Sequence, residues 1–279
     1  MRRTKIIATL GPATDKPGML EKLLVAGVDV FRLNYSHQTH ADHEKRMREI
    51  RCLSQQHKHA VAVIADLQGP KIRIERFKKG KVKLHEGAKF SINTKLACDD
   101  GDEIQVGVSY KELPKDVKAK DKLMLDDGRV VLKVKAVHKH IIDCKVITGG
   151  ILSNNKGINL QGGGLSANAV TEKDIEDMKH AAKVKVDYIA ISFPRDANDI
   201  KIARKMMKEC SCKAQLISKI ERAEALNHIE EMIEASDAIM IARGDLGVEI
   251  GDASLPPVQK RLIKMAREMD RAVITATQM

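Results

Sequence analysis

Short apolar runs separated by amphipathic stretches make up most of the chain. Seven of these runs are rich in Val, Ile and Ala, and most become polar at the C-terminal end. Continuous apolar runs of this kind are typical of strands that are buried on both faces of a parallel sheet. The seven predicted strands are Lys5–Leu10, Val28–His37, Val61–Gln68, Val186–Phe193, Ala214–Glu221, Asp237–Asp245 and Ala272–Met279.

Segments with helical periodicity lie between most of the predicted strands. One of them opens with Thr171 and Asp174, a variant of the capping box, which prefers Glu or Gln at its last position. Alternating strands and helices predict an α/β fold. The predicted helices are Leu20–Ala26, Ala41–Gln56, Thr171–Val184, Asp196–Glu209, Ala223–Ala235 and Pro257–Met269.

The pattern changes after the third predicted strand. From about Lys71 to Asn168 it consists of short alternating strands with turn signals, such as Asp126-Asp127-Gly128 before the strand Val130–Val137. We therefore predict a small, barrel-like β lid domain at residues 70–168, inserted into a catalytic domain made of residues 1–69 and 169–279. Gly162-Gly163-Gly164 is predicted to be a flexible joint near the return crossing.

Two architectures suit this order of elements, a doubly wound open sheet and a (β/α)₈ barrel. A nucleotide-binding open sheet normally has a phosphate loop after its first strand, but Leu10 is followed by Gly-Pro-Ala-Thr and no GxxxxGK[ST] occurs. Gly162-x-Gly164-x-x-Ala167 matches a dinucleotide fingerprint by letters, yet it lies at the domain crossing. Polar residues at the ends of several strands favour the barrel.

The second predicted strand carries a polar face. Side chains at i, i+2 and i+4 point the same way in a strand, so Arg32, Asn34 and Ser36 share one face. Such a trio suits a phosphate or a hydrated metal ion, and the alternative is a buried polar cluster satisfied by its neighbours. Asp66, at the end of the third strand, is predicted to be a ligand, a helix cap or a partner for Arg73.

The fifth and sixth predicted strands end in acidic residues. The same alternation places Lys219 with Glu221 and Arg243 with Asp245. Because Mg²⁺ commonly takes one or two carboxylates, Glu221 and Asp245 could share one ion. The alternative is a structural ion pair within either strand. Backbone N–H groups around Gly244 are predicted to hold an anion such as a carboxylate.

Composition narrows the range of partners. The chain has 49 Lys and Arg against 38 Asp and Glu, a net charge of +11 that suits anionic partners. Aromatic residues make up only 3% and Trp is absent, which disfavours a nucleic-acid binder. No apolar run approaches the ~20 residues of a membrane span, no signal peptide is evident, and the five cysteines are scattered. We expect a cytoplasmic protein without disulfides.

Five segments, in order along the chain, resemble the signatures of pyruvate kinases. The spacing agrees over the whole chain, including an inserted β-domain of about 100 residues. The resemblance implies a TIM-type (β/α)₈ barrel. The segments are Thr4–Pro12, Phe31–His37, Ile217–Arg222, Met240–Gly247 and Ala276–Met279.

The resemblance implies a phosphotransferase that uses Mg²⁺ or Mn²⁺ and moves phosphate from phosphoenolpyruvate to ADP, giving pyruvate and ATP in glycolysis. It implies that Glu221 and Asp245 bind the metal ion and that Lys219 neutralises the phosphoryl group and the developing enolate. Thr277, which spacing alone predicts to be a core residue, corresponds to the hydroxyl that takes part in pyruvate protonation. The other implied contacts are Arg32 and Arg73 with phosphate, Gly244, Asp245, Thr277 and Ser192 with substrate, and Pro12, Asn34, His37 and Lys156 with the nucleotide.

The chain departs from the family pattern at Lys71. Many family members have Glu there, and that Glu accompanies activation by K⁺ at a monovalent site, for which the candidates in this chain are Asn34, Ser36 and Asp66. An ammonium group could replace the charge of the monovalent ion. We expect activity that does not require K⁺.

The second departure is the end of the chain. The seven predicted strands are one fewer than a closed barrel has, and the family continues into an allosteric C-terminal domain. We expect both to be missing from a chain that ends at Met279, as in a truncated product or a partial sequence. The full-length form is expected to be a homotetramer.

Three rival functions remain. A Mg²⁺-dependent barrel lyase or aldolase acting on pyruvate or oxaloacetate enolates would use the same carboxylate pair but needs no nucleotide lid. A non-catalytic fragment would aggregate or pair through its open edge. A nucleic-acid binder would show salt-dependent retention on DNA or RNA.

Overall fold

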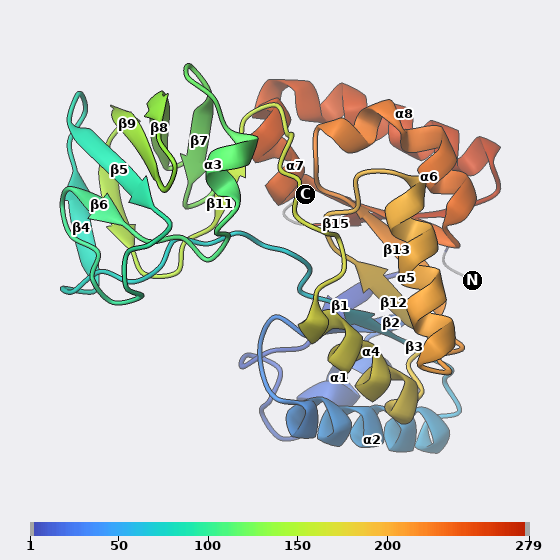
Figure 1. Ribbon diagram of the computed structural model, residues 1–279. Helices are drawn as coiled ribbons and strands as arrows, with labels where there is room; N and C mark the ends of the chain where they lie inside the picture. Colours follow the sequence, from blue (N-terminus) through green and yellow to red (C-terminus); the bar gives the residue numbers. More distant parts are fainter. Residues whose placement is uncertain (1–2, 277–279) are drawn as a thin grey trace.

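A seven-stranded parallel sheet forms the larger lobe of the computed structural model, which describes residues 3–276 (Figure 1). Its strands lie side by side in the order in which they occur in the chain, and neighbours pair in parallel. A doubly wound sheet would reverse its strand order at a switch point. The observed order therefore confirms the barrel-type winding. The strands are β1 (Ile7–Thr9), β2 (Val30–Asn34), β3 (Ala62–Asp66), β12 (Tyr188–Ile191), β13 (Gln215–Ile220), β14 (Ala238–Ala242) and β15 (Ala272–Ala276).

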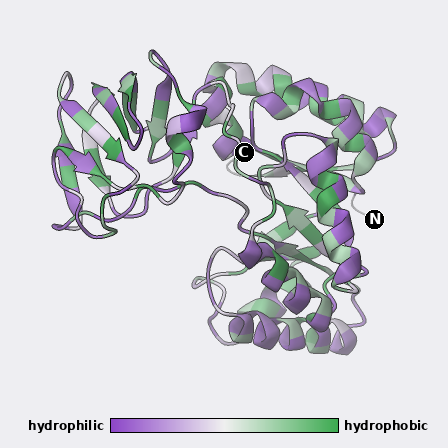
Figure 2. Ribbon diagram, viewed as in Figure 1, coloured by the Kyte–Doolittle hydropathy of each residue, from purple (hydrophilic) through white to green (hydrophobic). Residues whose placement is uncertain are grey.

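Helices cover the outer face of this sheet, close to the predicted positions. Thr171 and Asp174 form the predicted capping box, and each bonds the backbone of the other. Figure 2 shows hydrophobic residues along the strands and hydrophilic residues on the outer faces of the helices. These helices are α1 (Met19–Val25), α2 (His40–Gln56), α4 (Glu172–Val184), α5 (Ala197–Glu209), η1 (Glu224–Asn227), α6 (Ile229–Ala235), η2 (Asp252–Ser254) and α8 (Leu255–Glu268).

Several of the predicted strands end earlier than expected, and two of them, the second and the sixth, differ most. The sixth stops at Ala242 and the chain turns into a helix, α7 (Arg243–Ile250). The prediction that Arg243 and Asp245 share a strand face is therefore wrong. The helix is favoured here because it buries Leu246 against the core. The second strand likewise stops at Asn34, and the N–H of Ser36 donates to the Asn34 Oδ1 (3.1 Å) in the turn that follows.

The insertion forms a second lobe, at the left in Figure 1. It contains a two-stranded sheet, a six-stranded sheet and its own hydrophobic cluster. The predicted turn at Asp126 and Asp127 is present, with positive φ at both residues, and it joins two antiparallel strands. The elements are β4 (Lys81–Leu84), β5 (Lys89–Asn93), β6 (Gln105–Val106), α3 (Leu113–Asp116), β7 (Lys122–Leu125), β8 (Val130–Val137), β9 (Ile141–Thr148), β10 (Gly150–Ser153) and β11 (Ile158–Leu160).

No helix in the described part of the chain combines the length and the apolar character that a bilayer crossing requires.

Candidate active site

The C-terminal ends of the parallel strands, here called the carboxyl rim, gather the polar residues that the sequence analysis selected. Asn34 and Asp66 lie opposite each other at the ends of β2 and β3. Lys219 is on β13, Glu221 follows that strand directly, and Ser192 follows β12. In parallel β/α architectures this edge of the sheet is where ligands bind, so the winding of the sheet explains why residues far apart in sequence meet.

Lys219 is the centre of the cluster. Its Nζ lies 2.9 Å from Glu221 Oε1, 3.2 Å from Asp66 Oδ1 and 2.8 Å from Ser192 Oγ. Burial disfavours the charged ammonium, but the carboxylates of Glu221 and Asp66 outweigh that cost and raise the pKa of Lys219. A cation is therefore fixed at the carboxyl rim with almost no exposure to water.

Asp66 connects Lys219 to a second cation. Arg32 donates from Nε to Asp66 Oδ2 (2.6 Å) and from a terminal nitrogen to Thr9 Oγ1 (3.0 Å). Asp66 is buried, whereas about a quarter of the Arg32 side chain remains exposed. The carboxylate orients the guanidinium, and the exposed part can still contact an anion. Of the three alternatives for Asp66, the pairing with Arg73 is not realised, since the partners of Asp66 are Arg32 and Lys219.

Glu221 is a buried carboxyl group with further carboxylates nearby. Its Oε2 accepts a hydrogen bond from the Phe193 N–H (2.8 Å). Burial raises the pKa of Glu221, the charges of Asp245 and Asp66 raise it further, and Lys219 opposes the rise. Additional positive charge at this position would therefore be stabilised.

Asp245 lies in the first turn of α7. It is bound by Lys71, which lies in the first crossing, where the chain passes from β3 into the inserted lobe. Lys71 donates to Asp245 Oδ1 over 2.9 Å. The alternative of an ion pair between Arg243 and Asp245 is not realised, because Lys71 takes the carboxylate. Gly244 precedes Asp245 in the same turn, and Ala242 provides no side-chain cap. The N–H groups of that turn are thus available to an anion.

The donor set fits a hard divalent cation. Within residues 3–276 no group of three or more His, Cys, Asp and Glu side chains is placed to form a complete metal cage. Mg²⁺ rarely needs such a cage, because it keeps several waters and takes one or two carboxylates together with substrate oxygens. Glu221 and Asp245 match that requirement, and the charge of Asp245 is one of the causes, after burial, that raise the pKa of Glu221, so the two carboxylates are close enough to interact.

Several predicted site residues lie away from the Lys219 cluster. Arg73 donates to the Asn155 carbonyl (2.9 Å), and Lys156 pairs with Asp126 Oδ1 (2.8 Å), so both make their polar contacts inside the inserted lobe. Pro12 and His37 lie in the loops that follow β1 and β2. The predicted role of Thr277 concerns a residue outside the described part of the chain.

Three features of this region were not predicted from the sequence. Lys71 donates to Asp245, Thr9 accepts a hydrogen bond from Arg32, and Glu249 is buried one turn after Asp245 on α7. Thr9 alone had a sequence signal, because it lies near the end of a predicted strand next to the one that carries Arg32. The other two depend on how α7 packs.

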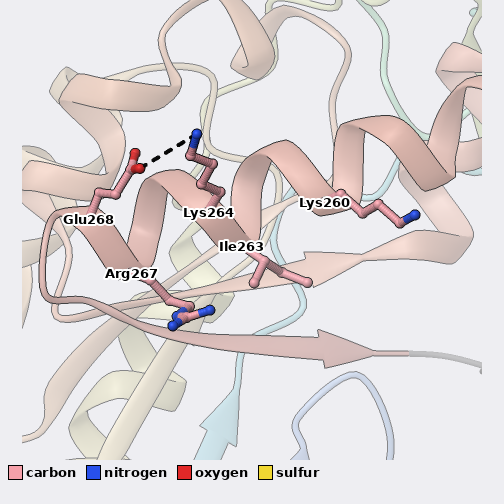
Figure 3. A pocket seen from close by; sticks show the side chains of 5 residues that line it. All are labelled: Lys260, Ile263, Lys264, Arg267 and Glu268. Atoms are coloured by element: carbon pink, nitrogen blue, oxygen red, sulfur yellow. Dashed lines mark ion pairs between the residues drawn. The ribbon is translucent and has the colours of Figure 1, made fainter.

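A hollow of about 430 Å³ on α8 is a separate feature (Figure 3). Lys264 and Glu268 bend toward each other as an ion pair at 3.8 Å, while Ile263 and Arg267 point toward β15. Its lining side chains all come from one helix. It lacks the convergence of charged groups from several strands that marks the carboxyl rim, and we do not assign it a catalytic role.

The fold and the rim together define a β/α-barrel protein with two carboxylates, a buried ammonium and a helix end that has no side-chain cap. Comparison with known sequences identifies the particular family. The family described as pyruvate kinase, barrel domain, matches residues 1–279. The chain belongs to the pyruvate kinase family.

Individual relatives agree with this assignment. The chain is 54% identical to a pyruvate kinase of Buchnera aphidicola, 51% identical to pyruvate kinase II of Salmonella typhimurium and 44% identical to a pyruvate kinase of Mycobacterium tuberculosis. Each match covers all of this chain but only 59%, 59% and 58% of the respective relative. The chain therefore spans about three fifths of the length of these relatives.

Proposed function

We propose that the protein transfers the phosphoryl group of phosphoenolpyruvate to ADP, giving pyruvate and ATP in glycolysis. The observation that carries the proposal is the buried Lys219, held by Asp66 and Glu221 at the carboxyl rim beside the carboxylate of Asp245. Phosphoryl transfer depends on positioning and charge stabilisation more than on covalent help from the protein. This cluster supplies charge of that kind.

The residues divide the work as follows. A divalent ion held by Glu221 and Asp245 would neutralise oxygens of the substrate. Lys219 presents a fixed positive charge to the transferred phosphoryl group and to the enolate left behind, and Arg32 directs its exposed guanidinium at phosphate. The N–H groups of the first turn of α7, around Gly244, hold the substrate carboxylate. Ser192 donates to the Leu67 carbonyl (2.7 Å), which leaves its oxygen free to accept from Lys219 and keeps the ammonium in place.

The nucleotide is proposed to bind between the two lobes. Asn34 contributes from the end of β2, Pro12 and His37 from the rim loops and Lys156 from the inserted lobe. Arg73, like Arg32, is proposed to contact phosphate. Residues 70–168 act as a lid over the catalytic domain, and lid closure excludes water, which prevents loss of phosphate to solvent.

Four finer features belong to the same proposal. Lys71 replaces the charge of a monovalent ion near Asn34, Ser36 and Asp66, so that K⁺ is not required. In this structure the Lys71 ammonium forms an ion pair with Asp245. The pyruvate proton comes by way of Thr277. The protein works in the cytoplasm, and its full-length form is a homotetramer.

The test is a coupled assay of pyruvate release from phosphoenolpyruvate with Mg²⁺, run with and without ADP on the protein as its cell makes it. Release that depends strictly on ADP supports the proposal. Equal release without ADP contradicts it, and turnover of an oxaloacetate or aldol substrate would favour the lyase or aldolase instead.

A further inference from the structure

Glu249 occupies the junction between the two lobes. It lies on α7, one turn after Asp245, and is 5% exposed. Its Oε2 accepts from the Ala223 N–H on the barrel side (2.8 Å), while its Oε1 accepts from Asn159 Nδ2 of β11 on the insert side (3.4 Å). One carboxyl group thus bonds both lobes.

The return crossing from the insert to the barrel also contacts α7. The N–H of Gly162 donates to the backbone carbonyl of Glu249 (3.3 Å). The N–H of Gly164 donates to Glu224 Oε2 (2.8 Å), in the barrel segment that contains Ala223. A Cβ on Gly163 would lie 1.7 Å from the same Glu224 oxygen, so glycine permits this close approach. The three consecutive glycines lie directly at this contact.

The barrel-side bond of Glu249 is short and its two insert-side contacts are longer. Hydrogen bonds weaken toward the longer distances, so the carboxyl is anchored on the barrel and yields on the insert side. The adjoining cavity, about 20 Å³ and lined by Asn159, Glu249 and Lys71, has room for about one water molecule. Relative movement of the lobes therefore acts on Glu249 directly and is not absorbed by a layer of solvent.

Both crossings of the insert end on the same helix. The first crossing reaches α7 through Lys71 and Asp245, and the return crossing reaches it through Gly162, Asn159 and Glu249. We propose that Glu249 is a positioning residue that transmits the position of the insert to α7 and thereby to Asp245. This inference rests on the proposed function for its catalytic meaning, but the mechanical coupling stands on the contacts alone.

The environment of Glu249 disfavours its charged form. Burial raises the pKa of Glu249 to about 7, and the charge of Glu224 adds to the rise, while the Ala223 N–H, Asn159 and Arg222 oppose it. Near neutral pH the carboxyl is therefore not a firmly charged anchor. Its hydrogen bonds, more than its charge, connect the lobes.

The test measures hydrogen exchange of the protein as its cell makes it. Glu249→Ala changes the barrel side of the junction, and Asn159→Ala changes the insert side. Asn159→Ala loses one long hydrogen bond, so we expect exchange to be faster by about two- to fivefold. Glu249→Ala loses that bond and also the short bond from the Ala223 N–H, so we expect exchange to be faster by at least about tenfold. Both effects should be seen at residues 162–164 and in the first turn of α7. Glu209→Gln, at the exposed end of α5, is the matched control and leaves both segments unchanged. Glu249→Gln retains an oxygen that accepts from Ala223, and its NH₂ group can donate to the Oδ1 of Asn159 once the Asn159 amide is turned over, so slow exchange is expected to be restored.

Faster exchange confined to one side of the junction, or a Glu249→Gln variant as fast as Glu249→Ala, would overturn the proposal. Steady-state kinetics supply a second readout, with kcat lowered in Glu249→Ala and the KM for phosphoenolpyruvate raised. Should the wild-type protein fail to turn over at all, the proposed function is wrong, while exchange on both sides still decides the coupling.

Discussion

Replacing Lys219 with Met tests the centre of the site, because this substitution removes the charge and keeps most of the volume. The ammonium makes three contacts of 2.8–3.2 Å, with Ser192, Glu221 and Asp66. In the proposed reaction, its loss removes a preorganised cation from the position at which charge would develop during phosphoryl transfer. One such group typically contributes a factor of about 10²–10³ in kcat.

The same change also has a cost in stability. Removing one partner of a buried ion pair costs about 3–5 kcal/mol, because the other charge is left uncompensated. In Lys219→Met, Asp66 still has Arg32 and Glu221 still accepts from the Phe193 N–H, so we expect the lower end, about 3 kcal/mol. A divalent ion at Glu221 would supply the missing positive charge. Mg²⁺ should therefore reduce the difference in unfolding free energy between Lys219→Met and the wild type.

The assay pairs turnover with chemical denaturation, with and without Mg²⁺. Lys205→Met, a change of the same kind at an exposed position of α5, is the control and should match the wild type in both measurements. A Lys219→Met variant that retains kcat within a factor of about ten of the wild type would refute the catalytic reasoning. A stability loss that Mg²⁺ leaves unchanged would refute the proximity of the metal ion to Glu221.

Three further predictions concern the surroundings of the site. Activity with Na⁺ or a bulky organic cation as the only monovalent ion should equal activity with K⁺, because Lys71 supplies a positive charge; a large loss of rate in the coupled assay would contradict this. His43 is fully buried, and burial together with Arg46 lowers its pKa to about 4. The unfolded chain therefore binds this proton first as the pH falls, so stability is lost between about pH 6.5 and pH 4, by up to about 3 kcal/mol. The denaturation midpoint of His43→Phe should lack this part of the pH dependence. An equal change of the midpoint with pH in His43→Phe and the wild type would contradict the assignment. Gly69→Ala would place a Cβ 2.7 Å from the Cβ of Ser192 at a φ of +63°, so we expect a loss of about 2–4 kcal/mol from strain and crowding together and a lower kcat. Gly18→Ala, at a φ of +73° with open space around it, is the control and should show the strain alone.

Periodicity was sufficient to predict most of the fold. The apolar runs around Leu33, Ile64, Ile189 and Ile239 place fully buried side chains on their strands, and the helices between them begin and end close to the predicted residues. Local chemistry also succeeded at Thr171, since a cap needs only residues within one turn of each other. These features depend on neighbours in sequence.

The failures have a tertiary cause. The apolar run that enters Arg243 resembles a strand that becomes polar at its end, and a helix begins there because α7 packs Leu246 against the barrel core and Glu249 against the insert. Lys71 and Asp245 are 174 residues apart. No spacing rule connects them. The Lys71 ammonium reaches the Asp245 carboxylate because both segments that join the insert to the barrel contact α7.

The candidate site was predicted in part for the same reason. Strand alternation placed Lys219 beside Glu221, and parallel strands present their C-terminal ends at one rim, but the contact of Lys219 with Asp66 was not predicted. Their specific partners could not be predicted, since they depend on loops and on backbone groups such as the Phe193 N–H.

A Mn²⁺ titration followed by electron paramagnetic resonance tests the shared carboxylate pair most directly, with the wild type, Glu221→Gln and Asp245→Asn compared at one pH. The site assignment predicts one bound ion in the wild type and binding weakened by at least about tenfold in each variant, since each removes one of two carboxylate ligands. Unchanged Mn²⁺ affinity in both variants would show that the two carboxylates do not hold a common ion.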